Sequence, residues 1–70
     1  MKRRDLIRQL RDAGDDAGLE FTSLRNTGGH EVFSLEGLRI PIPNHGEVAE
    51  GTVRSIMRQA AAKLGEEWWT

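Results

Sequence analysis

The chain has 70 residues, with 10 Lys and Arg against 11 Asp and Glu, a formal net charge of −1 and a pI near 6.1. This length predicts one small domain, and a content of 37% hydrophobic and 30% charged residues is typical of a globular chain. The absence of cysteine excludes disulfides, thiolate metal ligands and a cysteine nucleophile. No apolar run approaches the ~20 residues of a membrane helix, and no apolar segment follows the basic start, so neither a membrane span nor a secretory signal is expected.

The charges are unevenly distributed along the chain. Residues 1–11 hold half of the Lys and Arg with a single Asp, and residues 12–20 hold only acidic charges. A basic N-terminal segment attracts phosphates, although a solvated helix face would look the same. The pI near 6.1 argues against a tight, sequence-independent nucleic-acid binder.

A first helix is predicted over residues 3–17. Leu6, Ile7 and Leu10 lie at helical spacing, and Gly18 is suited to end the helix. Gly14 is a weak point within this stretch because glycine disfavours a helix interior.

Three strands are predicted over residues 19–25, 30–35 and 38–43. The four residues 26–29 have the composition of a turn, and the two-residue gap Glu36-Gly37 predicts a tight hairpin. Pro41 and Pro43 alternate with apolar residues in the third strand, which is therefore expected at an edge of the sheet.

A second helix is predicted over residues 51–64, and the tail 65–70 follows it. Apolar residues recur at helical spacing from Val53 to Leu64, and Gly65 can end the helix. Trp68 and Trp69 in the tail either fold back onto the small core or form an exposed patch for a partner. The element order predicts an α+β fold, α-β-β-β-α, with one three-stranded antiparallel sheet and both helices on one face.

Histidine is the residue type whose unperturbed pKa lies near neutrality, and the chain has two. His30 follows Gly28-Gly29 at the start of a strand, where glycines allow close approach of a bulky substrate. One histidine can act as general acid or base without a metal, and RNA suits such minimal equipment because it carries its own nucleophile, the 2′-OH. The alternative is a turn histidine held by a structural hydrogen bond. His45 lies in ordinary turn composition, and no His, Asp or Glu spacing matches a metal-ligand pattern, so neither metal nor cofactor is expected.

Three segments resemble the HicA family of type II toxin–antitoxin toxins. They are residues 27–33, residues 38–45 and residues 50–60, and the opening residues 2–10 are similar to the family's first helix. The most specific is Gly51 to Ala60, which fits the family pattern G-T-[LV]-R-S-I-[LM]-[RK]-Q-A. The resemblance covers about residues 2–61.

This resemblance implies a double-stranded-RNA-binding-like fold and a metal-independent mRNA endoribonuclease that arrests translation in the cytoplasm under stress. The family's catalytic histidine in its G-x-H motif corresponds to His30. The implied partners are mRNA and a HicB-like antitoxin that blocks the active site, with oligomers formed through that complex. Two features depart from the family: Gly29 stands where many members have Ser, and the chain is slightly acidic.

Candidate RNA-binding residues are the turn glycines and basic side chains of both helices. Alternatives to a ribonuclease are a non-catalytic RNA-binding module of the same fold and a small protein-interaction domain. Two further arginines, Arg25 and Arg39, lie in predicted strands, but the sequence does not reveal their register relative to His30. The candidate RNA-binding residues of the turn and of the basic segments are Gly28, Gly29, Lys2, Arg3, Arg4, Arg8, Arg54 and Arg58.

Overall fold

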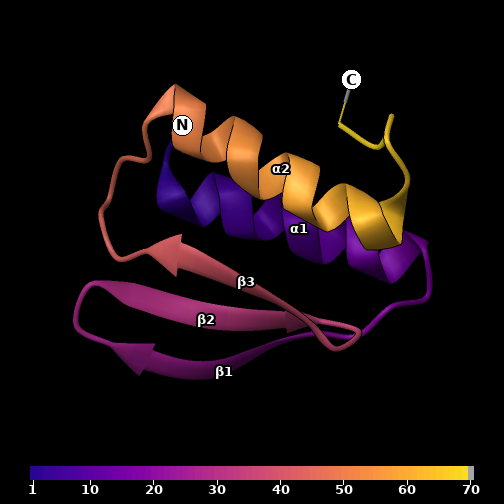
Figure 1. The fold of residues 1–70 in the computed structure, drawn as a ribbon, viewed down its shortest axis with the longest axis horizontal. Helices are drawn as coiled ribbons and strands as arrows, with labels where there is room; N and C mark the ends of the chain where they lie inside the picture. Colours follow the sequence, from indigo (N-terminus) through magenta and orange to yellow (C-terminus); the bar gives the residue numbers. More distant parts are fainter. Residues whose placement is uncertain (70) are drawn as a thin grey trace.

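The computed structural model describes residues 1–69, and it has the element order expected from the sequence. The elements are α1 (Arg3–Asp16), β1 (Phe21–Thr27), β2 (His30–Leu35), β3 (Leu38–Pro43) and α2 (Glu50–Leu64). The strands form one antiparallel sheet in the order β1-β2-β3, and both helices cover the same face of it (Figure 1). In the described part of the chain, neither helix has the length and apolarity to cross a membrane.

Two-residue turns join the three strands. Thr27 pairs with His30 across Gly28-Gly29, and Leu35 pairs with Leu38 across the second turn. Both residues of that second turn have positive φ, 50° at Glu36 and 91° at Gly37, which is the twist that a tight antiparallel hairpin requires. The predicted hairpin is confirmed, and the proline-containing β3 lies at an edge of the sheet as expected.

The first strand begins at Phe21, two residues later than residue 19, where the sequence placed it, and extends to Thr27. The helix end explains the late start. The backbone N–H of Leu19 donates to the carbonyl of Gly14 at 2.8 Å, and Gly18 takes a φ of 71°, so these residues close α1 and cannot join the sheet. For the same reason α1 ends at Asp16, one residue before its predicted end. In turn, α2 begins at Glu50, one residue before its predicted start.

The hydrophobic core lies between the helices and one face of the sheet. Phe21 and Phe33 stack with ring centroids 4.9 Å apart and planes at 1°. Gly14 allows α1 to pack closely against the sheet, because a Cβ at this position would crowd Leu35 Cδ1 at 3.3 Å. Burying each aliphatic or aromatic side chain contributes about 1.5–3 kcal/mol. Within residues 1–69, no helix covers the opposite face of the sheet, which we call the outer face (Figure 1). The core residues are Leu6, Leu10, Phe21, Phe33, Leu35, Ile40, Ile42, Val48, Val53, Ile56, Met57 and Ala60.

The tryptophan tail folds back onto the core. Trp68 and Trp69 are half-buried and pack against the core, and Trp68 Nε1 donates to the carbonyl of Met57 at 2.9 Å. Of the two expectations for the tail, the structure thus favours packing over a free exposed patch. The last predicted tail residue, Thr70, lies outside the described residues.

Candidate functional site

The sheet register places His30 on the outer face. Successive strand residues point to opposite faces, and in β2 Phe33 and Leu35 are buried beneath the helices. His30 has the opposite parity to both, so its side chain faces outward. It is exposed at the first position of β2, opposite Thr27 on one neighbouring strand and Pro43 on the other.

The imidazole of His30 makes no hydrogen bond or ion pair with any residue from 1 to 69. The alternative was a turn histidine held by a structural hydrogen bond. No residue within that range supplies such a bond to His30. Both ring nitrogens are available to a substrate, which is the geometry required of a side chain that exchanges a proton with a bound molecule.

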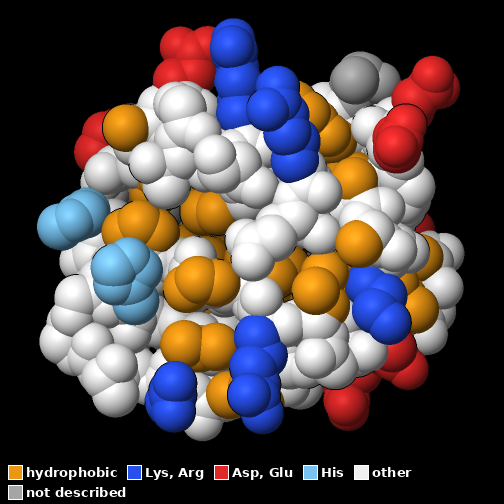
Figure 2. Space-filling model, in the orientation of Figure 1, with side chains coloured by type: hydrophobic (Ala, Val, Ile, Leu, Met, Phe, Trp, Pro, Cys, Tyr) orange, Lys and Arg blue, Asp and Glu red, His pale blue; other side chains and the backbone are white. Residues whose placement is uncertain are grey.

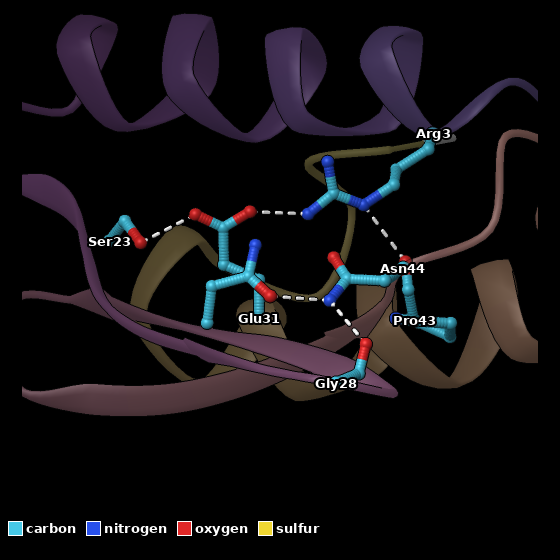
Figure 3. A network of polar contacts seen from close by, with 7 residues as sticks. Arg3, Ser23, Gly28, Glu31, Pro43 and Asn44 are labelled. Atoms are coloured by element: carbon cyan, nitrogen blue, oxygen red, sulfur yellow. Dashed lines mark hydrogen bonds and ion pairs between the residues drawn. The ribbon is translucent and has the colours of Figure 1, made fainter.

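A polar network behind His30 fixes the strand that carries it (Figure 3). The carboxylate of Glu31 accepts hydrogen bonds from Ser23 Oγ at 2.6 Å and from Arg3 Nη2, and Arg3 Nε donates to the carbonyl of Pro43 at 2.9 Å. These hydrogen bonds, from Ser23 first and then from Arg3, lower the pKa of Glu31. The start of α1 is thereby tied to all three strands beside His30.

Asn44 holds the glycine turn that precedes His30. Its Nδ2 donates to the carbonyl of Gly28 at 2.9 Å and to Asn26 Oδ1, and its backbone N–H donates to the carbonyl of Gly29 at 3.0 Å (Figure 3). The φ of Gly28 is 52°, and nothing lies within 4 Å of a Cβ added at Gly28 or Gly29. The turn is therefore fixed from behind and open in front, so a large substrate can approach it.

The predicted basic residues of α1 begin at the same end of the molecule as the glycine turn. The N–H of Arg3 donates to the carbonyl of Gly46 at 3.0 Å, which joins the helix start to the loop after β3. Lys2, Arg3 and Arg4 line a depression of about 620 Å³ with Gly46 and Glu47. The guanidinium of Arg3 is committed to Glu31 and Pro43, whereas Lys2 and Arg4 are exposed.

The structure does not gather the other predicted cations into one cluster with His30. Arg8 pairs with Asp5 at 2.7 Å and Arg54 pairs with Glu50 at 2.9 Å, both on exposed helix surfaces. Arg58 borders a depression of about 400 Å³ beside the tryptophan tail, together with Ala61, Glu66 and Trp69.

Both histidines of the chain lie close to one another on the face seen in Figure 2. This proximity follows from the register, because His30 pairs with Pro43 and His45 is two residues further along. No group of three or more potential metal ligands occurs among the residues the structure describes.

A comparison with protein families places this site in context. The model of the HicA toxin of bacterial toxin–antitoxin systems matches residues 3–62. The chain belongs to the HicA toxin family. No curated protein and no solved structure matches it. Membership of the HicA family implies a toxin–antitoxin system and therefore an antitoxin partner. The match to HicA covers the glycine turn, His30 and the network of Arg3, Glu31 and Asn44, whereas the tryptophan tail lies beyond it.

Proposed function

We propose that this HicA-family toxin is an mRNA endoribonuclease in which His30 is the catalytic general acid–base group. The observation that carries the proposal is the exposed, unbonded imidazole of His30 at the end of an open glycine turn, in a family of toxins. The hydrogen bonds of Glu31, Arg3 and Asn44 support the backbone on both sides of His30 and hold it in one place.

The proton transfers and the nucleophile of the proposed reaction come from the imidazole and the RNA alone. His30 takes the proton of a 2′-OH, the 2′-oxygen attacks the adjacent phosphorus, and the bond from phosphorus to the 5′-oxygen breaks. The leaving 5′-oxygen takes up the proton that His30 removed from the 2′-OH, so the products are a 2′,3′-cyclic phosphate and a 5′-hydroxyl, and the imidazole returns to its neutral form. General acid–base catalysis contributes on the order of 10²–10⁴-fold in rate, and cations near the site stabilise the negative charge that develops on the phosphoryl oxygens. Cleavage is proposed to need no metal ion.

Several residues are proposed to bring RNA to His30. Gly28 and Gly29 let the backbone of the RNA approach, and Lys2 and Arg4 attract phosphates to the same end of the molecule. Arg3, Arg8, Arg54 and Arg58 add positive charge, but the first three are already bonded to carboxylates.

The proposed partner is a HicB-like antitoxin that covers His30 and keeps RNA away from it. Released toxin would cleave mRNA in the cytoplasm and arrest translation during stress, and larger assemblies would form through the toxin–antitoxin complex. The support for a partner of this kind is the family match.

Controlled expression of the wild type, His30→Ala and His45→Ala tests the proposal. We expect growth arrest and loss of mRNA from the wild type and from His45→Ala, and neither from His30→Ala. His45→Ala is the matched control because it removes the chain's other exposed imidazole from the neighbouring loop. If His30→Ala is folded and still destroys mRNA, the assignment is wrong. RNA that is bound by the wild type but never shortened would indicate a non-catalytic binding module.

A further inference from the structure

We infer that the outer face of the sheet is the track on which the RNA strand lies, and that Arg25 and Arg39 hold its phosphates beside His30. This inference rests on the proposed function and assigns it a binding surface. Neither arginine belongs to the helices that carry the other basic candidates, since Arg25 lies in β1 and Arg39 lies in β3.

A β-bulge at Leu24 brings Arg25 to this face. Ser23 pairs with Phe33 and Arg25 pairs with Val32, so Leu24 is an extra residue in β1. Without it, regular alternation would place Arg25 opposite Glu31, on the helix-covered face. Bulges of this kind redirect side chains and occur often beside active sites. On β3, Arg39 lies opposite Ser34. Ser34 points outward, as His30 does, so Arg39 points outward as well.

The charged residues at the outward strand positions are all positive. The outward positions of the three strands hold Arg25, Arg39 and His30 and no Asp or Glu, because Glu31 points to the other face. Neither arginine side chain has a hydrogen-bond or ion-pair partner among residues 1–69. In Figure 2, basic side chains lie at the left and centre of the lower margin, where the strands run, and acidic side chains lie at its right end. An acidic chain therefore keeps an uncompensated positive strip on the face that carries His30.

The surface between the two arginines is hollowed, with two aliphatic side chains at its base. Leu24, Arg25, Val32 and Arg39 line a depression of about 300 Å³, and Leu24 is 50% exposed. Arg25 pairs with Val32 and Arg39 pairs with Ser34, two and four residues beyond His30 on β2. At ~3.3 Å per strand residue, the two arginines therefore lie ~7 Å and ~13 Å from His30 along the strand direction. The arrangement suits a strand whose phosphates meet the two guanidiniums in turn while a ribose or base rests on Leu24 and Val32.

The chemistry favours RNA over a protein as the ligand of this strip. Guanidinium groups bind phosphate with paired, charge-assisted hydrogen bonds. The outward strand positions hold no Phe, Tyr or Trp, so base stacking contributes little, and binding should depend on phosphate contacts and hence on salt.

The test measures RNA binding separately from cleavage, on proteins that carry His30→Ala. A labelled single-stranded RNA is titrated with this protein and with its Arg25→Gln/Arg39→Gln version over a range of salt concentrations. Each phosphate contact contributes ~0.7 to the slope of log K against log salt. We expect the double substitution to lower the slope by ~1.4 and to weaken binding roughly tenfold at low salt. The control is Lys63→Gln, which removes one exposed charge from the last turn of α2 and should change neither quantity.

Four further results test the inference and separate it from the proposed function. The version with Arg25→Lys and Arg39→Lys should retain the slope, because it retains both charges. If the double Gln version binds RNA like its parent, or loses only antitoxin binding, the inference is overturned. If the wild type never cleaves RNA but its binding still depends on both arginines, the proposed catalysis fails and the track stands. In the His30-containing protein, the double Gln substitution should lower cleavage at limiting RNA by roughly the same factor as binding.

Discussion

Replacing Glu31 with Gln tests whether the network behind His30 holds the fold together at this end of the molecule. The side chains of Glu31 and Arg3 are 18% and 22% exposed, so their ion pair is shielded from water more than the surface pairs. Glu31 accepts two hydrogen bonds, and one to a charged group contributes about 1.5–3 kcal/mol. Because Gln keeps the shape and part of the bonding, we expect a loss of about 1–2 kcal/mol in the free energy of unfolding.

The size of this loss should depend on pH. The pKa of Glu31 is lowered in the folded protein, so the unfolded chain takes up the proton first as the pH falls. The stabilisation is complete above the ordinary pKa of glutamate, about 4.3, and is lost as the pH falls through the lower folded value. The difference between the wild type and Glu31→Gln should therefore be largest near neutrality and shrink in acid.

Thermal unfolding followed by circular dichroism measures this difference. For a domain of this size, 1 kcal/mol corresponds to about 4–8 °C in Tm, so Glu31→Gln should melt roughly 5–15 °C lower at neutral pH. The matched control is Glu50→Gln, which removes the exposed pair with Arg54 and should cost less than about 1 kcal/mol. A Tm difference for Glu31→Gln that is as small as the control's, or that does not change between about pH 7 and pH 3.5, would refute the reasoning.

Other substitutions test other parts of the account. Asn44→Ala removes two side-chain hydrogen bonds from the glycine turn; it should cost about 1–2 kcal/mol in chemical denaturation and slow RNA cleavage, and unchanged cleavage would show that the turn does not position His30. Phe33→Ala removes the ring that stacks on Phe21 and should lower the free energy of unfolding by about 3–5 kcal/mol. This loss is enough to unfold so small a domain at 25 °C, as circular dichroism would show, and a cooperative melt above that temperature would contradict the expectation. Trp68→Phe keeps an aromatic ring but loses the indole N–H and its bond to Met57, so Tm should fall by a few degrees while the cleavage rate stays unchanged. A large loss of cleavage would link the tail to the site.

Much of the fold could be predicted from the sequence because the local signals agree. Glu36-Gly37 lies between two alternating segments, and Gly18 and Gly65 both take positive φ at helix ends. The boundary of β1 was predicted too early, because Leu19 looks like a strand residue but its N–H closes α1. The fate of Trp68 and Trp69 depended on tertiary packing, which no local pattern reveals.

The candidate site was predictable only in part. The glycine pair marked His30, but the residues that support it are distant in sequence: Arg3 and Glu31 are 28 positions apart, and Asn44 and Gly28 are 16 apart. The position of Arg25 depends on the bulge at Leu24, and the register shift there has no signature in a strand of mixed residues. The bond of Arg3 to Glu31 likewise becomes visible only in three dimensions, whereas the pairs of Arg8 with Asp5 and of Arg54 with Glu50 have the three- and four-residue spacing of neighbours on one helix.

The most direct test of the central claim is cleavage of a defined RNA by the purified protein, with the product ends identified. The wild type should produce 2′,3′-cyclic phosphate and 5′-hydroxyl ends in the presence of a chelator. It should leave intact an RNA that carries a 2′-deoxy sugar at the cleaved position. His30→Ala should be slower by a factor on the order of 10²–10⁴, with an unchanged circular dichroism spectrum. Equal cleavage by His30→Ala, or cleavage of the 2′-deoxy substrate at the same bond, would contradict the account.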